Sequence, residues 1–77
     1  MEIEIEFFGP IKRPWVEHRR RIQVAQGSCV ASVMGELGYD IEQLRMVALT
    51  INGQKVSPGH VLMDNDELTV VLLAGGG

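Results

Sequence analysis

Residues 67–77 read Glu67-Leu68-Thr69-Val70-Val71-Leu72-Leu73-Ala74-Gly75-Gly76-Gly77, and this stretch decides the fold. Leu68, Val70 and Leu72 occupy alternate positions, which is the period of a strand with one buried face. Three glycines follow, and glycine accepts almost any backbone conformation. The stretch predicts a strand that leads directly into a flexible tail. We therefore expect a domain over residues 1–74 and a glycine tail over residues 75–77.

The same period of two appears in segments upstream of this last strand. Ile3, Ile5 and Phe7 alternate with three glutamates in the first segment, so one face of that strand is predicted to be buried. Similar patterns predict strands over residues 2–8, 19–24, 46–51 and 54–56. We expect the first and last strands to lie side by side and parallel at the centre of one sheet.

One amphipathic helix is predicted between the second and third strands. Its apolar residues fall at helical spacing on one face, and Gly38 is a suitable left-handed terminator. These apolar residues are Val30, Val33, Met34 and Leu37. Ser28 or Cys29 is expected at the N-cap position, and Gly35 is expected to allow close packing of the helix on the sheet. Residues 39–45 are expected to form a connection only.

The turn residues complete the chain order. Asn52-Gly53 is typical of a tight hairpin, since both central residues of such a turn need positive φ. Asp64-Asn65-Asp66 predicts another turn before the last strand. The order is strand, strand, helix, strand, short strand, strand, which gives an α+β fold with one core.

Size and composition restrict the function. A chain of 77 residues forms one domain, and it is too small to enclose a deep catalytic pocket of the usual kind. The net charge of −3 argues against a nucleic-acid partner. A single cysteine cannot form an internal disulfide, which fits a reducing compartment. Since no apolar run is long enough to span a membrane and the N-terminus carries no signal peptide, we expect a cytoplasmic protein without a membrane partner.

Four segments resemble the ubiquitin-like β-grasp sulfur carriers, a family that includes the small subunit of molybdopterin synthase and the sulfur carrier of thiamine thiazole synthesis. Residues 27–38 resemble the capped helix of that family, residues 47–56 its Asn-Gly hairpin, residues 62–68 its turn before the last strand, and residues 76–77 its terminal diglycine. The resemblance implies a mixed sheet of four to five strands packed on one main helix. Two features depart from the family pattern: Cys29 stands where the family often has Thr, and the tail has three glycines instead of two.

The resemblance also implies a chemistry for the tail. In such carriers an adenylating enzyme uses ATP to activate the terminal carboxylate, and a sulfur donor such as a persulfide enzyme converts it to a thiocarboxylate. A synthase then accepts the sulfur. Here the activated carboxylate would be that of Gly77, with Gly76 and Gly75 entering the narrow enzyme site. The chain would be a carrier without a bound cofactor and not an enzyme. The alternative is that the tail is a frayed end without a role.

A carrier also needs a surface for docking. Alternation predicts that some side chains of the third and last strands point away from the helix and form an apolar patch leading toward the tail. These residues are Met46, Ala48, Thr50, Thr69, Val71 and Leu73. The alternative is that they are ordinary exposed apolar surface.

Other residues give weaker indications. The basic run at residues 18–21 is expected to form cross-strand ion pairs with Glu2, Glu4 and Glu6, and not to bind nucleic acid. Cys29 is expected to be a small packed residue, although a reactive thiol at a helix start is the alternative. His18 and His60 lack ligand-like spacing, so no metal site is predicted.

Two questions stay open at the level of sequence. The long loop after the first strand is more like the molybdopterin branch, whereas the short link over residues 39–45 and the three glycines are more like the thiazole branch, which we favour slightly. Two other functions compete with sulfur transfer. One is a ubiquitin-type modifier joined to lysines through Gly77, and the other is an interaction module with an idle tail.

Overall fold

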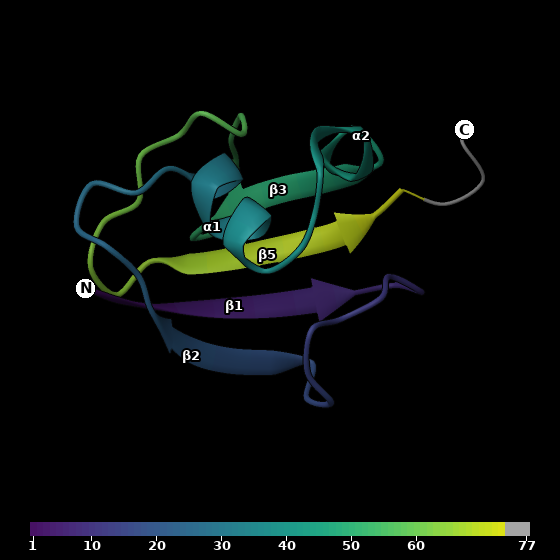
Figure 1. Ribbon diagram of the computed structural model, residues 1–77, viewed down its shortest axis with the longest axis horizontal. Helices are drawn as coiled ribbons and strands as arrows, with labels where there is room; N and C mark the ends of the chain where they lie inside the picture. Colours follow the sequence, from purple (N-terminus) through teal and green to yellow (C-terminus); the bar gives the residue numbers. More distant parts are fainter. Residues whose placement is uncertain (74–77) are drawn as a thin grey trace.

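The computed structural model describes residues 1–73. They form one five-stranded mixed sheet with the strand order β2-β1-β5-β3-β4 and two short helices (Figure 1). The elements are β1 (Glu2–Phe8), β2 (Arg19–Gln23), α1 (Val30–Glu36), α2 (Ile41–Leu44), β3 (Val47–Ile51), β4 (Gln54–Lys55) and β5 (Glu67–Leu72). The predicted α+β fold is therefore confirmed. No helix within the described part of the chain is long and apolar enough to cross a membrane.

The first and last strands lie side by side and parallel at the centre of the sheet, as expected. Ile5 is opposite Leu68 and Phe7 is opposite Val70, while the other neighbouring strands are antiparallel. Because the two central strands run in the same direction, their carboxyl ends lie at one end of the sheet (Figure 1). That end also leads to residue 74.

The core lies between the sheet and the helices. Each central strand buries alternate residues, which is why the period of two was readable in the sequence. The residues with 0–2% exposure are Ile3, Ile5, Phe7, Val30, Val33, Met34, Leu62, Leu68 and Val70. These residues belong to one hydrophobic cluster, and Leu68 and Val70 fix β5 in its place in the sheet by packing in this cluster.

The predicted turns have the expected backbone. Asn52 and Gly53 have φ values of 51° and 84°, so both central residues of the hairpin are left-handed. Asn65 has a φ of 68° in the turn before β5, and Gly38 has a φ of 101° just after α1. Asp66 joins these regions, since its carboxylate accepts from the Met63 N–H at 2.8 Å and from Asn52 Nδ2 at 3.1 Å.

The connection predicted over residues 39–45 is wrong, because it contains the short helix α2. Asp40 Oδ1 accepts from the Gln43 N–H at 2.9 Å, and Gln43 Oε1 accepts from the Asp40 N–H at 2.8 Å. This reciprocal capping box satisfies two backbone groups of the first turn. Four residues are too few to show helical periodicity, so the apolar pattern of the sequence does not predict this helix.

Two expectations about α1 need correction. Cys29, one of the two expected residues, is at the N-cap position, but its side chain makes no capping hydrogen bond. Its Sγ lies instead 3.2 Å from Ser32 Oγ. Gly35 faces open space, with nothing within 4 Å of a Cβ placed there, so close helix–sheet packing does not explain this glycine.

Candidate docking site at the end of the last strand

The last strand delivers the chain to the edge of the described structure. β5 ends at Leu72, and the Leu73 N–H donates to the Met46 carbonyl at 2.9 Å, which continues the pairing one residue past the strand. Ala74 and the predicted activation residues Gly75, Gly76 and Gly77 lie outside the described residues. Among residues 1–73, the candidate site therefore consists of the surface around the end of β5.

Four of the predicted docking residues meet on the open face of the sheet. Ala48 is opposite Val71 and Thr50 is opposite Thr69 in the pairing of β3 with β5. All four are half-buried, and their neighbours along the strands point into the core. Leu73, one residue past β5, is 53% exposed. The structure thus brings these residues together on one face near the start of the tail.

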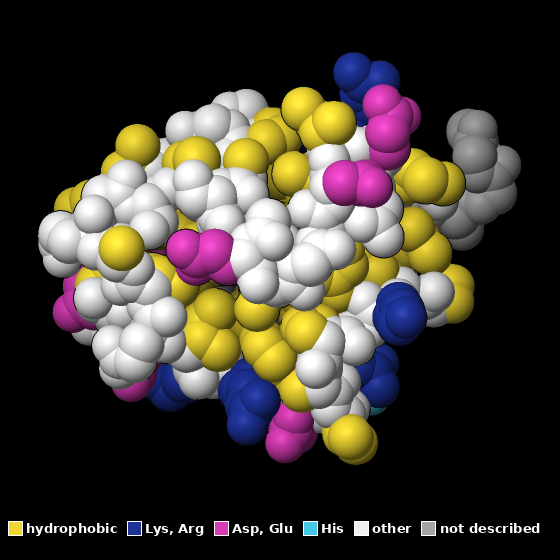
Figure 2. Space-filling view, in the orientation of Figure 1, with side chains coloured by type: hydrophobic (Ala, Val, Ile, Leu, Met, Phe, Trp, Pro, Cys, Tyr) yellow, Lys and Arg dark blue, Asp and Glu magenta, His cyan; other side chains and the backbone are white. Residues whose placement is uncertain are grey.

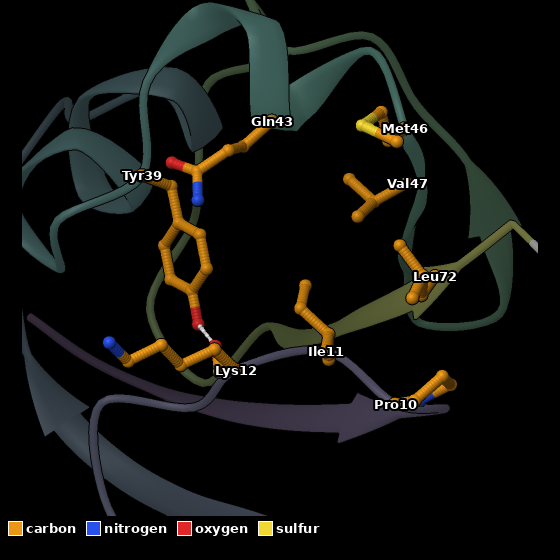
Figure 3. Close-up of a pocket in the computed structure, with 8 residues that line it drawn as sticks. All are labelled: Pro10, Ile11, Lys12, Tyr39, Gln43, Met46, Val47 and Leu72. Atoms are coloured by element: carbon orange, nitrogen blue, oxygen red, sulfur yellow. Dashed lines mark hydrogen bonds between the residues drawn. The ribbon is translucent and has the colours of Figure 1, made fainter.

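Met46 is placed differently. It precedes β3, is 58% exposed, and lines a cavity on the side of the sheet that carries α2, together with Val47 and Leu72 (Figure 3). It therefore borders that cavity, while Ala48 and Thr50 belong to the open face.

Phe8 belongs to the same open face and was missed at the sequence level. It is opposite Val71 at the end of β1 and is 47% exposed. The signal was available, because Phe8 follows Glu2, Glu4 and Glu6 at intervals of two. We name Phe8, Ala48, Val71 and Leu73 the open-face patch.

The other half of the open face is charged. Arg19 lies 3.7 Å from Glu4 and 3.9 Å from Glu6, and Arg21 forms an ion pair and hydrogen bond with Glu2. The hydrogen bond that Arg21 donates to the Glu2 carboxylate raises the pKa of the Arg21 guanidinium. The predicted cross-strand pairs are confirmed, so the charges of these two arginines are matched by carboxylates within the sheet.

An apolar cavity of about 180 Å³ lies on the opposite side of the same sheet end (Figure 3). It is lined by Pro10, Ile11, Lys12, Tyr39, Gln43, Met46, Val47 and Leu72. The Tyr39 hydroxyl donates to the Lys12 carbonyl and so ties the loop after β1 to the segment before α2. We name this space the apolar cavity.

Tyr39 forms the inner wall of the apolar cavity. Its ring stacks on Phe7, with centroids 6.0 Å apart, and Trp15 meets Phe7 from another side at 5.9 Å. Burial raises the pKa of the Tyr39 hydroxyl, and the nearby Arg13 charge opposes this shift. The hydroxyl is therefore kept protonated, as a donor to the Lys12 carbonyl requires.

Cys29 lies away from this end, at the start of α1. The Ser32 hydroxyl, as its hydrogen-bond partner, lowers the pKa of the thiol. Within residues 1–73, no group of three or more His, Cys, Asp and Glu side chains is placed to hold a metal ion.

The ThiS family model matches residues 5–77, which is nearly the whole chain. The chain belongs to the ThiS family of ubiquitin-like sulfur carriers. Because the match includes residues 74–77, the family assignment covers the glycine tail as well as the domain. No curated protein matches the chain in sequence.

Solved structures of ubiquitin-like proteins share the fold of this ThiS-family chain. SAMP1 from Haloferax volcanii aligns over 100% of both chains, with 17% identity and a TM-score of 0.75. A putative molybdopterin converting factor subunit 1 from Pyrococcus furiosus aligns over 92% of this chain and 95% of its own, with 19% identity and a TM-score of 0.73. Both likenesses identify the fold as the predicted β-grasp.

A third structure is a complex of subunits 1 and 2 of molybdopterin-converting factor from Helicobacter pylori. One chain of that complex aligns over its whole length with the whole of this chain, with 25% identity and a TM-score of 0.67. In this ThiS-family chain, both the open-face patch and the apolar cavity flank the point where β5 leads into the tail.

Proposed function

We propose that this chain carries sulfur as a thiocarboxylate on Gly77. A partner enzyme would join the Gly77 carboxylate to AMP from ATP with release of pyrophosphate. The terminal sulfur of a persulfide on a donor enzyme would then attack the carbonyl carbon, and AMP would leave. A second thiol on the partner side would cleave the resulting S–S bond, which releases the thiocarboxylate and leaves a disulfide between that thiol and the donor cysteine. The chain itself would be the carrier and the substrate, with no bound cofactor and no enzyme activity of its own.

The observation that carries this proposal is the match to the ThiS family, which runs through Gly77. The fold supports it physically. The buried β5 is paired on both sides, so it gives the following residues a fixed starting point. Gly75, Gly76 and Gly77 have no side chains, and they can therefore enter a channel too narrow for other residues.

We assign docking to the open-face patch. Exposed apolar side chains gathered on one face commonly mark a partner surface. The patch continues from Val71 on β5 to Leu73, immediately before the tail. A partner that holds the tail in its active site would therefore meet this patch at the same time.

The final acceptor in this proposal is a biosynthetic synthase in the cytoplasm. We favour the thiazole branch over the molybdopterin branch on the features of residues 39–45 and of the glycine tail. The structure of subunits 1 and 2 of molybdopterin-converting factor makes the second branch the necessary comparison. Both synthases should therefore be offered the charged carrier.

The test is the intact mass of the chain after incubation with the adenylating enzyme, ATP and a sulfur donor. A variant lacking Gly77 is the control. The expected result is a gain of one sulfur in place of oxygen, localised to the C-terminal fragment and absent from the control. The mass must be resolved from oxidation of one of the four methionines, which adds nearly the same amount. An enzyme that charges its own carrier but leaves this chain unchanged would refute the proposal.

A second candidate is protein modification through Gly77. The chain shares its fold, over the full length of both chains, with SAMP1, a small archaeal modifier protein. The same adenylate would then be attacked by a lysine amine of another protein. Lys12 and Lys55 are exposed and are the only lysines of the chain itself. Covalent adducts in cell extracts, lost in the variant lacking Gly77, would favour this function over sulfur transfer.

A further inference from the structure

A second depression adjoins the apolar cavity on the helix-bearing side of the sheet. It has a volume of about 270 Å³ and is lined by Lys12, Arg13, Pro14, Leu37, Gly38, Tyr39 and Gln43. Lys12, Tyr39 and Gln43 line both spaces, so the two depressions adjoin each other, and we name the pair the groove. The groove begins at Leu72, at the end of β5, and extends past Tyr39 to Arg13.

The two halves of the groove differ in chemistry. The half next to β5 is lined mainly by apolar side chains of the loop after β1, of β3 and of β5. The other half carries two cations, Lys12 and Arg13, and its lining contains no carboxylate. In Figure 2, hydrophobic side chains gather over the end of β5, and Lys or Arg side chains border them.

The cations of the groove are unmatched, although acidic residues outnumber Lys and Arg in this chain by 10 to 7. Within residues 1–73, the ion pairs involve Arg19, Arg21 and Arg45, and neither cation of the groove takes part. Arg13 donates one hydrogen bond to the Val16 carbonyl at 3.1 Å, which fixes its position without neutralising it.

Gln43 adds a donor to the same half. Its Oε1 is held by the Asp40 N–H in the capping box, so the orientation of the amide is fixed. Among the described residues, the hydrogen bonds of Gln43 in the capping box use its Oε1 and its backbone N–H, and Nε2 donates none. In Figure 3 the Gln43 amide lies near the backbone end of the Tyr39 side chain, and the Lys12 side chain lies near its hydroxyl end. Three donors therefore border the end of the groove beyond Tyr39.

We propose that this groove binds an extended segment of a partner protein that carries an apolar side chain and, two residues away, an Asp or Glu carboxylate. The apolar side chain would fill the cavity beside Leu72. The carboxylate would lie against Lys12, Arg13 and the Gln43 amide. In an extended segment, residues two apart point to the same side and lie roughly 7 Å apart, which suits two adjacent depressions.

The shape of the groove favours a peptide segment over a small molecule. Its two halves meet at Tyr39 and differ in chemistry, and each is smaller than the roughly 300–1,000 Å³ of sites that enclose drug-sized ligands. Two side chains of one segment suit such a pair of depressions. The location favours a partner that also meets the tail, because Leu72 is both the end of β5 and a wall of the cavity. The proposal does not depend on sulfur chemistry, since a modifier or an interaction module would present the same groove.

The test is a titration of the isotope-labelled full chain, followed by the NMR shifts of its backbone amides. The probe is the peptide acetyl-Gly-Leu-Gly-Asp-Gly-amide. One matched peptide has Asn in place of Asp, and another has Ala in place of Leu. We expect saturable shifts at Lys12, Tyr39 and Gln43 with the first peptide. The Asn replacement should weaken binding by about two- to fivefold, the range of a partly exposed ionic contact. The Ala replacement should weaken it by about tenfold, because it removes the apolar side chain that fills the cavity.

The variant Lys12→Gln with Arg13→Gln tests the cationic half directly. Lys12 is exposed and Arg13 is half-buried at the surface, and neither belongs to the core, so the variant should remain folded. We expect it to bind the Asp and Asn peptides equally. Lys55→Gln removes a charge from β4, outside the groove, and should keep the preference for Asp.

Three results would overturn the proposal. The first is the absence of saturable shifts at the groove with a folded chain. The second is equal binding of the Asp and Asn peptides by the unmodified chain. The third is a set of groove shifts that depends on protein concentration without peptide, which would assign the groove to a second copy of this chain.

Discussion

Tyr39 provides the sharpest test of the packing that builds the groove. Its ring is 8% exposed and stacks on Phe7, and its hydroxyl donates to the Lys12 carbonyl. Tyr39→Phe keeps the ring and removes only the donor. A hydrogen bond of this kind contributes about 0.5–1.5 kcal/mol, and the carbonyl left unpaired adds to the loss. We expect the free energy of unfolding to fall by about 1–2 kcal/mol.

This loss is large enough to measure. A domain of 77 residues has a free energy of unfolding of about 4–12 kcal/mol. The midpoint of thermal unfolding should fall by about 4–16 °C. Urea denaturation can be followed through Trp15, the single tryptophan, which contacts the Phe7 ring in the folded state. Equal stability of the variant and the unmodified chain would refute the role given to this hydroxyl.

The same residue predicts a dependence on pH. Burial raises the pKa of the Tyr39 hydroxyl above its ordinary value of 10.0, while the unfolded chain ionises at that value. The folded state therefore keeps a proton that the unfolded state releases. The stability from Tyr39 is fully present below pH 10.0 and is lost as the pH rises through the folded pKa. Tyr39→Phe should lack this alkaline component.

Phenolate absorbance assigns the titration, because Tyr39 is the only tyrosine. Arg13→Gln removes the charge that opposes the shift, so it should raise the pKa of Tyr39 further. A phenolate that forms at or below the ordinary pKa in the folded chain would contradict the burial described here.

Three further variants test other parts of the structure. Asp66→Ala should lower the free energy of unfolding, measured by urea denaturation, by about 2–4 kcal/mol, because Met63 and Asn52 lose a buried charged acceptor. The control Asp64→Ala, at an exposed position, should lower it by about 1 kcal/mol or less. Cys29→Thr should stabilise by about 0.5–1 kcal/mol by supplying the missing cap, and an unchanged melting temperature would contradict this. Phe8→Glu should keep the fold but lower kcat/KM for activation by about tenfold, whereas Val16→Glu, at an 87% exposed position, should not.

The sheet could be predicted from the sequence because its burial is one-sided. Ile3, Ile5 and Phe7 are inward and three glutamates are outward, so the alternation of types records the geometry directly. The turn at Asn52-Gly53 was equally readable, since few other residue pairs accept two positive φ values. Local chemistry fixes these features, and no distant contact is needed to infer them.

The groove could not be predicted, because it depends on contacts between distant segments. The hydrogen bond from Tyr39 to Lys12 joins residues 27 positions apart. Nothing in the sequence near either residue indicates the other. The helix α2, which carries Gln43 to the groove, was missed for a different reason. Its capping residues Asp40 and Gln43 show the expected spacing, but its apolar pattern is too short to indicate a helix.

The parallel pairing of β1 and β5 explains why two candidate surfaces lie at one end of the molecule. It places Phe8 and Leu72 at the same end of the sheet, Phe8 on the open face and Leu72 against the cavity on the other. β5 itself separates the two surfaces. A partner that grips residue 74 onward can therefore contact either surface or both. Because the surfaces share no side chain, changes at Phe8 and at Lys12 should have additive effects on the binding free energy of a partner that contacts both. If the two effects are strongly non-additive, binding of the partner at one surface depends on its binding at the other.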